Sequence, residues 1–156
     1  MNSCNLKPLP LGSSDFASLR EFNQIYVDKT KLIFEIASQR QKFFLSRPRR
    51  FGKSLLISTF ESLFKYGLRD FKGLAIEKLW KDGNTYNVVR LDFSEAKNFR
   101  NLEEFSARLT SVLSRGFSGC GFIYREDPIE TVSDQISDWL KTIPLNSLVL
   151  LIDEYD

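Results

Sequence analysis

Histidine is absent from the 156-residue sequence, and cysteine is scarce. Without histidine the chain lacks the most common zinc ligand and the most common general base, so acid–base chemistry would fall to carboxylates, lysine, tyrosine or water. The two cysteines, Cys4 and Cys120, are far apart in sequence and fit no C-x-x-C pattern, which argues against a secreted disulfide framework. We therefore expect a protein of the reducing cytoplasm.

The chain also lacks a marked excess of charge and a long apolar run. Its net charge is +2, from 22 basic and 20 acidic residues, which is too small to indicate nucleic acid or a membrane surface as a partner. No stretch approaches the ~20 apolar residues of a membrane span, and residues 1–11 do not have the pattern of a signal peptide. The sequence predicts a soluble, cytoplasmic protein with no membrane partner.

Strand-like and helix-like patterns alternate along the chain. A short helical turn capped by Ser14 is expected first, followed by helices that begin near Asp28, Lys53, Leu102 and Asp127, and strands are expected at 42–45, 87–94 and 148–152. The run Leu148–Ile152 is continuously apolar, which is typical of a strand buried on both faces. This alternation predicts an α/β fold of three layers, with a parallel sheet between helices.

The tripeptide Gly52-Lys53-Ser54 lies where an expected strand gives way to an expected helix. Free backbone N–H groups and the helix dipole make such a point suitable for an anion. In a phosphate-binding loop the glycine lets the backbone approach the phosphates, the lysine contacts the β and γ phosphates, and the hydroxyl binds Mg²⁺. Because such a tripeptide also occurs by chance at helix starts, both interpretations stay open at this point.

The beginning of this loop departs from the full pattern G-x-x-x-x-G-K-[ST]. The pattern requires glycine at position 47, where this chain has Arg47 followed by Pro48. Arginine adopts a positive φ only with strain, and proline restricts the preceding residue to extended backbone. The donors nearest the phosphates are therefore expected from Phe51, Gly52, Lys53, Ser54 and Leu55.

Two carboxylates, Asp153 and Glu154, directly follow the apolar strand Leu148–Ile152. Ligands of open α/β sheets bind at the carboxyl ends of the strands. An aspartate there can hold Mg²⁺ through water, and the adjacent glutamate can orient and deprotonate an attacking water. Two solvated acids beyond a core strand would give the same pattern, but a phosphate loop and an acid pair are independent requirements of one reaction. Together they favour ATP and Mg²⁺ as ligands.

The phosphate loop is surrounded by basic residues, namely Arg40, Lys42, Arg47, Arg49, Arg50 and Lys53. Three interpretations remain for this run: attraction of the triphosphate, contact with nucleic acid, or a solvated rim. No aromatic residue is interleaved with Arg47, Arg49 and Arg50, which disfavours a stacking platform for bases. We favour the triphosphate, with Arg49 and Arg50 as part of the ATP-binding loop.

Four parts of the chain resemble the AAA-ATPase-like family, which comprises P-loop proteins often found in bacteria. The matching parts are Pro10-Leu11-Gly12 with Phe16 and Leu19-Arg20, then Tyr26–Thr30, Phe44–Leu55 and Leu151–Asp156. The family resembles this chain in lacking the first glycine of the loop. By resemblance, Lys53 and Ser54 have the phosphate and magnesium roles, with Lys53 also catalytic, while Asp153 binds the metal and Glu154 activates the water.

The resemblance also implies that this chain is the N-terminal portion of a longer protein, because members typically carry a nuclease-like domain of the PD-(D/E)XK kind further along. Residues 1–40 are expected to pack on an ATPase core, 41–156, that is incomplete at its C-terminus. In related P-loop proteins the strand after the acidic strand lies between it and the phosphate-loop strand. We therefore expect the chain by itself to be a weak ATPase that aggregates readily.

The expected function is ATP binding with Mg²⁺-dependent hydrolysis that drives or gates an attached effector. A rival hypothesis is a nucleotide-dependent switch or scaffold that binds ATP without hydrolysing it. A third is a nucleic-acid-binding module that uses Arg47, Arg49 and Arg50. The base preference, the effector and the oligomeric state are left open by the sequence.

Overall fold

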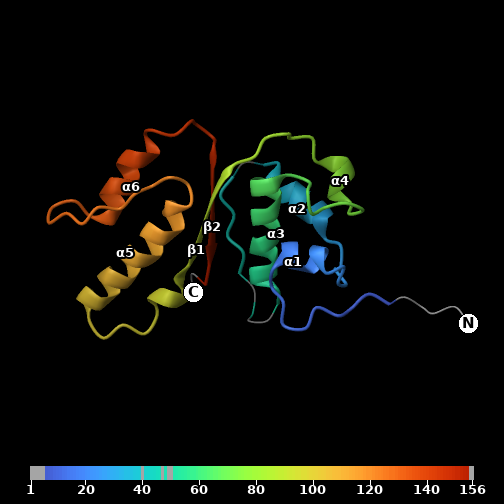
Figure 1. Cartoon of the computed structure of the whole chain (residues 1–156), viewed down its shortest axis with the longest axis horizontal. Coiled ribbons are helices and arrows are strands. Elements are labelled where there is room, and N and C mark those ends of the chain that lie inside the picture. The colour runs from blue at the N-terminus through green and yellow to red at the C-terminus, as the bar shows by residue number, and fades with distance from the viewer. Residues whose placement is uncertain (1–5, 40, 47, 49–50, 155–156) are drawn as a thin grey trace, which may run out of the picture. The chain divides into compact units, whose positions relative to one another are not determined.

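The computed structural model describes residues 6–39, 41–46, 48 and 51–154. The chain divides into two compact units, Met1–Thr85 and Tyr86–Asp156 (Figure 1). In the first unit the described elements are the helices α1 (Phe16–Glu21), α2 (Thr30–Ala37), α3 (Lys53–Tyr66) and α4 (Ile76–Leu79). The predicted boundary between residues 40 and 41 does not coincide with this division and stays a prediction.

The N-cap of helix α1 lies one residue later than expected. Asp15, and not Ser14, is the N-cap, and its Oδ2 accepts a hydrogen bond from the N–H of Ser18 at 2.8 Å. An aspartate immediately before the first turn satisfies one of the free N–H groups of the helix, which leaves no such role for Ser14. The buried face of α1 carries Phe16 and Leu19.

Asp28 lies before α2, but Lys29 is the residue at the N-cap position. Asp28 Oδ1 accepts the N–H of Thr30 at 2.8 Å and its hydroxyl at 2.7 Å, while Oδ2 accepts the N–H of Ala75 at 2.8 Å. Thr30 in turn accepts the N–H of Ile76 at 3.0 Å. Asp28 therefore links the beginning of α2 to the beginning of α4, a one-turn helix too short to give a sequence pattern.

Helix α3 is confirmed with the bounds expected from its apolar stripe. It packs against α1, with Leu63 fully buried, and ends at Gly67, whose N–H bonds to the carbonyl of Leu63 at 2.9 Å. The φ of Gly67 is 63°, and glycine adopts a positive φ without the steric cost of a side chain.

The strand expected at 42–45 is not present. Residues 42–46 have no regular secondary structure, and Phe43, Phe44 and Leu45 are exposed. An extended segment is assigned as a strand only where it exchanges hydrogen bonds with a neighbour, and the one sheet formed by the described residues consists of two other strands. Local β propensity alone was not sufficient here.

The second unit contains the sheet. Its elements are β1 (Asn87–Asp92), the 3₁₀ helix η1 (Phe93–Ala96), α5 (Leu102–Ser118), α6 (Val132–Leu140) and β2 (Leu148–Asp153). The two strands are parallel, with Asn87 opposite Leu148 and Asp92 opposite Asp153. Helices α5 and α6 lie on the same side of the strands (Figure 1). The core between them is formed by Val89, Leu91, Val112, Phe117, Phe122, Val132 and Ile136.

Strand β2 is confirmed, but its surroundings differ from the expectation of burial on both faces. Leu150 is 47% exposed and Ile152 is 39% exposed. Because α5 and α6 cover one side of the two strands, the continuous apolar run of β2 is only partly buried. The described chain thus has a mixed α/β fold with a small parallel sheet.

Helix α6 begins at Val132, later than the start expected near Asp127. Asp127 Oδ1 accepts the N–H groups of Ile129 at 2.7 Å and Glu130 at 2.9 Å, which closes a turn before the helix. The true N-cap is Thr131, which forms a reciprocal capping box with Asp134. Asp127 and Asp134 can both cap a helix, and the reciprocal pair of Thr131 with Asp134 determines where α6 begins.

Candidate functional site

The amino end of α3 carries the central residues of the predicted phosphate loop. Gly52 is its N-cap with a φ of 73°, and Lys53, Ser54 and Leu55 form the first turn. The first backbone hydrogen bond of the helix runs from the N–H of Leu56 to the carbonyl of Gly52 at 3.0 Å. The N–H groups of the first turn precede this bond, so they lie outside the backbone hydrogen-bond ladder of the helix, and the N-cap Gly52 has no side chain to cap them.

This helix end has the electrostatics of an anion site. No acidic residue lies in the first turn, while Lys53 adds a positive charge to the positive end of the helix dipole. The backbone at Gly52 is open, because no described atom lies within 4 Å of the position that a Cβ would occupy. Half-buried Ser54 adds a hydroxyl at the second helical position. These groups are suited to the oxygens of a phosphate chain.

The remaining loop residues are only partly described. Phe51 is exposed, and Lys42 lies in the exposed irregular segment 41–46. Four arginines of the predicted basic run, Arg40, Arg47, Arg49 and Arg50, lie outside the described residues. Their roles toward phosphate or nucleic acid stay predictions.

The body of α3 is anchored in the core of the first unit. Ser58 Oγ accepts the backbone N–H of Phe16 at 2.6 Å. The Phe16 ring is buried and packs against Phe71 at 4.7 Å and Tyr26 at 5.0 Å between ring centroids. Burial raises the pKa of Tyr26, although a hydrogen bond with Thr59 opposes this effect. These aromatic rings pack on one another, and they hold the helix that presents the loop.

The acid pair lies at the carboxyl end of β2, as predicted. Asp153 is only 4% exposed. Its Oδ1 accepts the N–H of Glu154 at 3.0 Å, and its Oδ2 lies 3.7 Å from Nη2 of Arg90. A buried carboxylate requires such compensation, because burial without partners is strongly unfavourable. Asp153 is therefore held by the backbone and by a cation from the middle of β1.

Glu154 has a left-handed backbone, with a φ of 53°. This conformation is uncommon for a residue with a side chain and often marks a functional site. The side chain is half-buried, and its Oε2 lies 3.2 Å from Nζ of Lys97. Each acid of the pair thus faces one cation of the same unit.

Arg90 and Lys97 were not recognised as site residues from the sequence. A signal for Arg90 did exist, since it interrupts the apolar run of β1 between Val89 and Leu91. No sequence signal marks Lys97, because its position depends on the turn that η1 makes after β1. Only the tertiary structure brings these two cations to Asp153 and Glu154.

The two groups of predicted residues belong to different units, the loop to the first and the acid pair to the second. In the part of the chain that the structure describes, no three His, Cys, Asp or Glu residues gather as a metal site. Mg²⁺ in nucleotide sites needs fewer protein ligands, since one or two carboxylates act together with phosphate oxygens and water. Ser54 and Asp153 offer donor types that fit this requirement.

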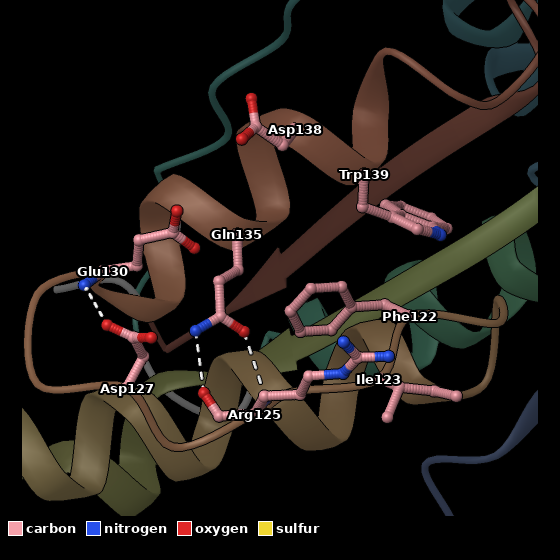
Figure 2. A pocket seen from close by; sticks show the side chains of 8 residues that line it. All are labelled: Phe122, Ile123, Arg125, Asp127, Glu130, Gln135, Asp138 and Trp139. Atoms are coloured by element: carbon pink, nitrogen blue, oxygen red, sulfur yellow. Dashed lines mark hydrogen bonds between the residues drawn. The ribbon is translucent and has the colours of Figure 1, made fainter.

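A hollow of about 340 Å³ lies elsewhere in the second unit, between α6 and the segment before it (Figure 2). Phe122 and Trp139 contribute rings to its wall, and Gln135 bonds to the backbone of Arg125 in both directions, at 3.0 and 2.7 Å. None of the predicted site residues lines it. The rings of Trp139 and Phe122 pack edge-on, with their centroids 6.0 Å apart.

No helix of the described chain is both long and apolar enough to cross a lipid bilayer.

Comparison with known proteins identifies a family. The model of the AAA-ATPase-like family, described as "Predicted AAA-ATPase", matches residues 10–156. A curated relative from Azotobacter chroococcum mcd 1, "Uncharacterized protein in vnfD 5'region", is 30% identical over 151 residues. The match covers 96% of this chain but 29% of that relative, so the chain spans less than a third of its length. No solved structure matches. Since the family model covers nearly the whole sequence and describes predicted ATPases, it supports nucleotide binding, and the chain belongs to the AAA-ATPase-like family.

Proposed function

We propose that this chain binds ATP with Mg²⁺ and that the full-length protein hydrolyses it. The observation that carries the proposal is the amino end of α3. There a left-handed glycine, a lysine and a serine occur in the order that a phosphate chain requires, at a first turn without acids. Membership of a family of predicted ATPases supports the same ligand.

The proposed roles divide between the two units. The N–H groups of Phe51–Leu55 and the ammonium of Lys53 bind the phosphates, with Arg49 and Arg50 adding positive charge. Ser54 and Asp153 hold Mg²⁺, which would neutralise phosphate charge when bound. The assembly of both groups around one nucleotide, in a three-layer P-loop arrangement, is part of the proposal.

Glu154 is proposed as the general base. It takes a proton from water while the water oxygen forms a bond to the γ phosphorus. The bond from that phosphorus to the β–γ bridging oxygen breaks, and ADP leaves with the electron pair. Lys53 stabilises the charge that develops on the phosphates.

The turnover is proposed to drive or gate an effector in the remainder of the protein, such as the nuclease-like domain implied by the resemblance. We propose the cytoplasm as its location. The alternative is a nucleotide-dependent switch that does not hydrolyse ATP, and substitution of Glu154 distinguishes the two.

Two substitutions in the full-length protein test the proposal. Lys53→Ala should weaken ATP binding by about 1.5–3 kcal/mol, or roughly 10- to 150-fold, because a charge-assisted contact with the phosphates is lost. Glu154→Gln should keep the affinity for ATP and abolish phosphate release. Binding is measured by titration with a fluorescent ATP analogue, and turnover by release of inorganic phosphate.

Lys65→Ala is the matched control, because Lys65 lies in the last turn of the same helix. It should leave both affinity and turnover unchanged. Equal titration curves for Lys53→Ala and wild type would refute the phosphate site. ATP binding with the same background phosphate release in wild type and Glu154→Gln would instead favour the switch.

A further inference from the structure

The contact between Lys97 and Glu154 has a consequence for the orientation of the proposed base. Lys97 Nζ lies 3.2 Å from Glu154 Oε2, and both side chains are about one-third exposed, at 36% and 32%. We propose that Lys97 is a positioning residue that holds one oxygen of the Glu154 carboxylate and leaves the other for the attacking water. This inference rests on the proposed function, in which Glu154 activates that water.

The backbone of Lys97 is fixed on one side by η1. Asp92, the last residue of β1, caps this turn by accepting the N–H of Ser94 at 2.9 Å. The turn closes at its other end with a hydrogen bond from the N–H of Lys97 to the carbonyl of Ser94 at 3.3 Å. Because β1 runs parallel to β2 and ends opposite it, η1 brings Lys97 to the carboxyl end of β2.

Helix α5 fixes Lys97 from the other side. Arg108 Nη1 donates to the carbonyl of Lys97 at 3.3 Å, and Arg108 Nη2 bonds to Glu104 at 2.7 Å. Glu104 also accepts the backbone N–H of Arg100 at 2.9 Å. The segment between η1 and α5 is thus tied at several points, so the start of the flexible lysine side chain is well defined.

The Glu154 end of the contact is equally constrained. Asp153 is paired in the strand ladder opposite Asp92, and its carboxylate accepts the N–H of Glu154. The left-handed φ of Glu154 turns the chain immediately after the strand. Backbone strain of this kind persists only where the surroundings impose it. Both ends of the Lys97–Glu154 contact are therefore held by separate elements.

The contact is better suited to orientation than to stability. Partly exposed ion pairs typically contribute only a fraction of a kcal/mol, because solvent screens them and two long side chains lose freedom. A base acts efficiently only if its oxygen is directed at the proton it removes, and a displacement of about 1 Å can cost roughly a hundredfold in rate. A weak contact at this place can thus have a large effect on turnover.

The test uses the full-length protein with Lys97→Met, which removes the charge and keeps an unbranched side chain, and Lys97→Arg, which keeps the charge. We expect Lys97→Met to lower kcat roughly 10- to 100-fold, with KM and the affinity for ATP within about twofold of wild type. Lys97→Arg should restore most of the rate. Lys141→Met is the control, because it removes another lysine–carboxylate pair of the same unit, with Asp138.

A second measurement does not depend on turnover. In nucleotide-free protein, the effects of Lys97→Met and Glu154→Gln on the melting temperature should be non-additive by roughly 1–4 °C, whereas Lys141→Met and Glu154→Gln should be additive. If the effects of Lys97→Met and Glu154→Gln on the melting temperature were additive, the two side chains would not interact and the proposal would be wrong. If the wild type hydrolyses ATP and Lys97→Met leaves this rate unchanged or increases it, the positioning role is wrong but the proposed ATPase activity stands. Wild type that neither binds nor hydrolyses ATP would overturn both.

Discussion

At the scale of single residues, the phosphate loop depends on one backbone angle. Gly52 has a φ of 73° at the N-cap of α3, and nothing described crowds its Cα. An alanine side chain would therefore meet no atom of the described residues, but its backbone would still have to be left-handed. Among the described residues, the requirement for glycine at this position is thus conformational.

Gly52→Ala should therefore reduce both stability and ligand affinity. The left-handed conformation costs an alanine about 1–2 kcal/mol, which would either destabilise the folded state or shift the loop away from its binding geometry. We expect a stability loss of up to this amount and a roughly tenfold weaker affinity for ATP. Urea unfolding and ATP titration measure the two effects.

The control for this substitution is Gly83→Ala. Gly83 is exposed, has no positive φ and has no described atom within 4 Å of its Cβ position, so alanine should be tolerated. If Gly52→Ala behaved like this control in both measurements, the left-handed loop would be incorrect.

At the scale of elements, the second unit depends on the close approach of α5 to β1. A Cβ at Gly116 would lie 2.4 Å from Leu91 Cδ2 and 3.2 Å from the carbonyl oxygen of Arg90. Leu91 belongs to the buried core of this unit, so its side chain has little room to move. Arg90 is also the strand residue whose guanidinium faces Asp153, so this packing supports the predicted site.

Gly116→Ala should destabilise the second unit by about 1–3 kcal/mol, because overpacking outweighs the ~1 kcal/mol by which alanine favours a helix interior. Gly119→Ala is the matched control at the end of the same helix. Gly119 has φ and ψ of −62° and −15° and an open Cβ position, so its replacement should be neutral or slightly stabilising. The stabilities of the two variants are compared by urea unfolding, followed by tryptophan fluorescence. Similar unfolding curves for both would contradict the close packing of α5 on β1.

At the scale of the whole molecule, carboxylates in both units have lowered pKa values. The Arg69 guanidinium, together with the Ser62 hydroxyl, lowers the pKa of Asp70 despite its partial burial. For Asp28, burial raises the pKa, but hydrogen bonds from Thr30 and Ala75 outweigh it and the net shift is downward. In the second unit the pKa values of Glu104, Asp127 and Asp134 are lowered by hydrogen bonds from Arg100, Glu130 and Thr131, respectively.

These shifts predict acid sensitivity. A carboxylate with a lowered pKa in the folded state binds protons less readily than in the unfolded chain, so its stabilising contribution is present above the ordinary pKa of 3.8 and is lost as the pH falls below that value. The free energy of unfolding should thus fall steeply below about pH 4. Asp70→Asn should lower stability at neutral pH and make its decline in acid shallower, as measured by urea unfolding between pH 7 and pH 3.

Glu35→Gln serves as the comparison, because Glu35 is an exposed carboxylate on α2 of the same unit. It should reproduce the wild-type pH profile. An Asp70→Asn profile parallel to that of wild type would show that Asp70 does not contribute to the acid sensitivity.

The sequence by itself determined the features that depend on neighbouring residues. The helix after Ser54, the apolar strand before Asp153 and the family resemblance were all readable, because helical periodicity, apolar runs and motifs are local patterns. The loop residues Lys53 and Ser54 were placed at a helix start for the same reason.

Only the tertiary structure decided the features that depend on contacts between distant residues. Residues 42–45 have β propensity but form no regular secondary structure, and Leu150 remains exposed because α5 and α6 cover one side of the sheet. The starts of α1 and α6 depended on which of several capable side chains made the cap. Lys97 and Arg90 reach the acid pair through a turn and a strand register. Such contacts are not encoded in any short segment, because they form only when separate elements pack.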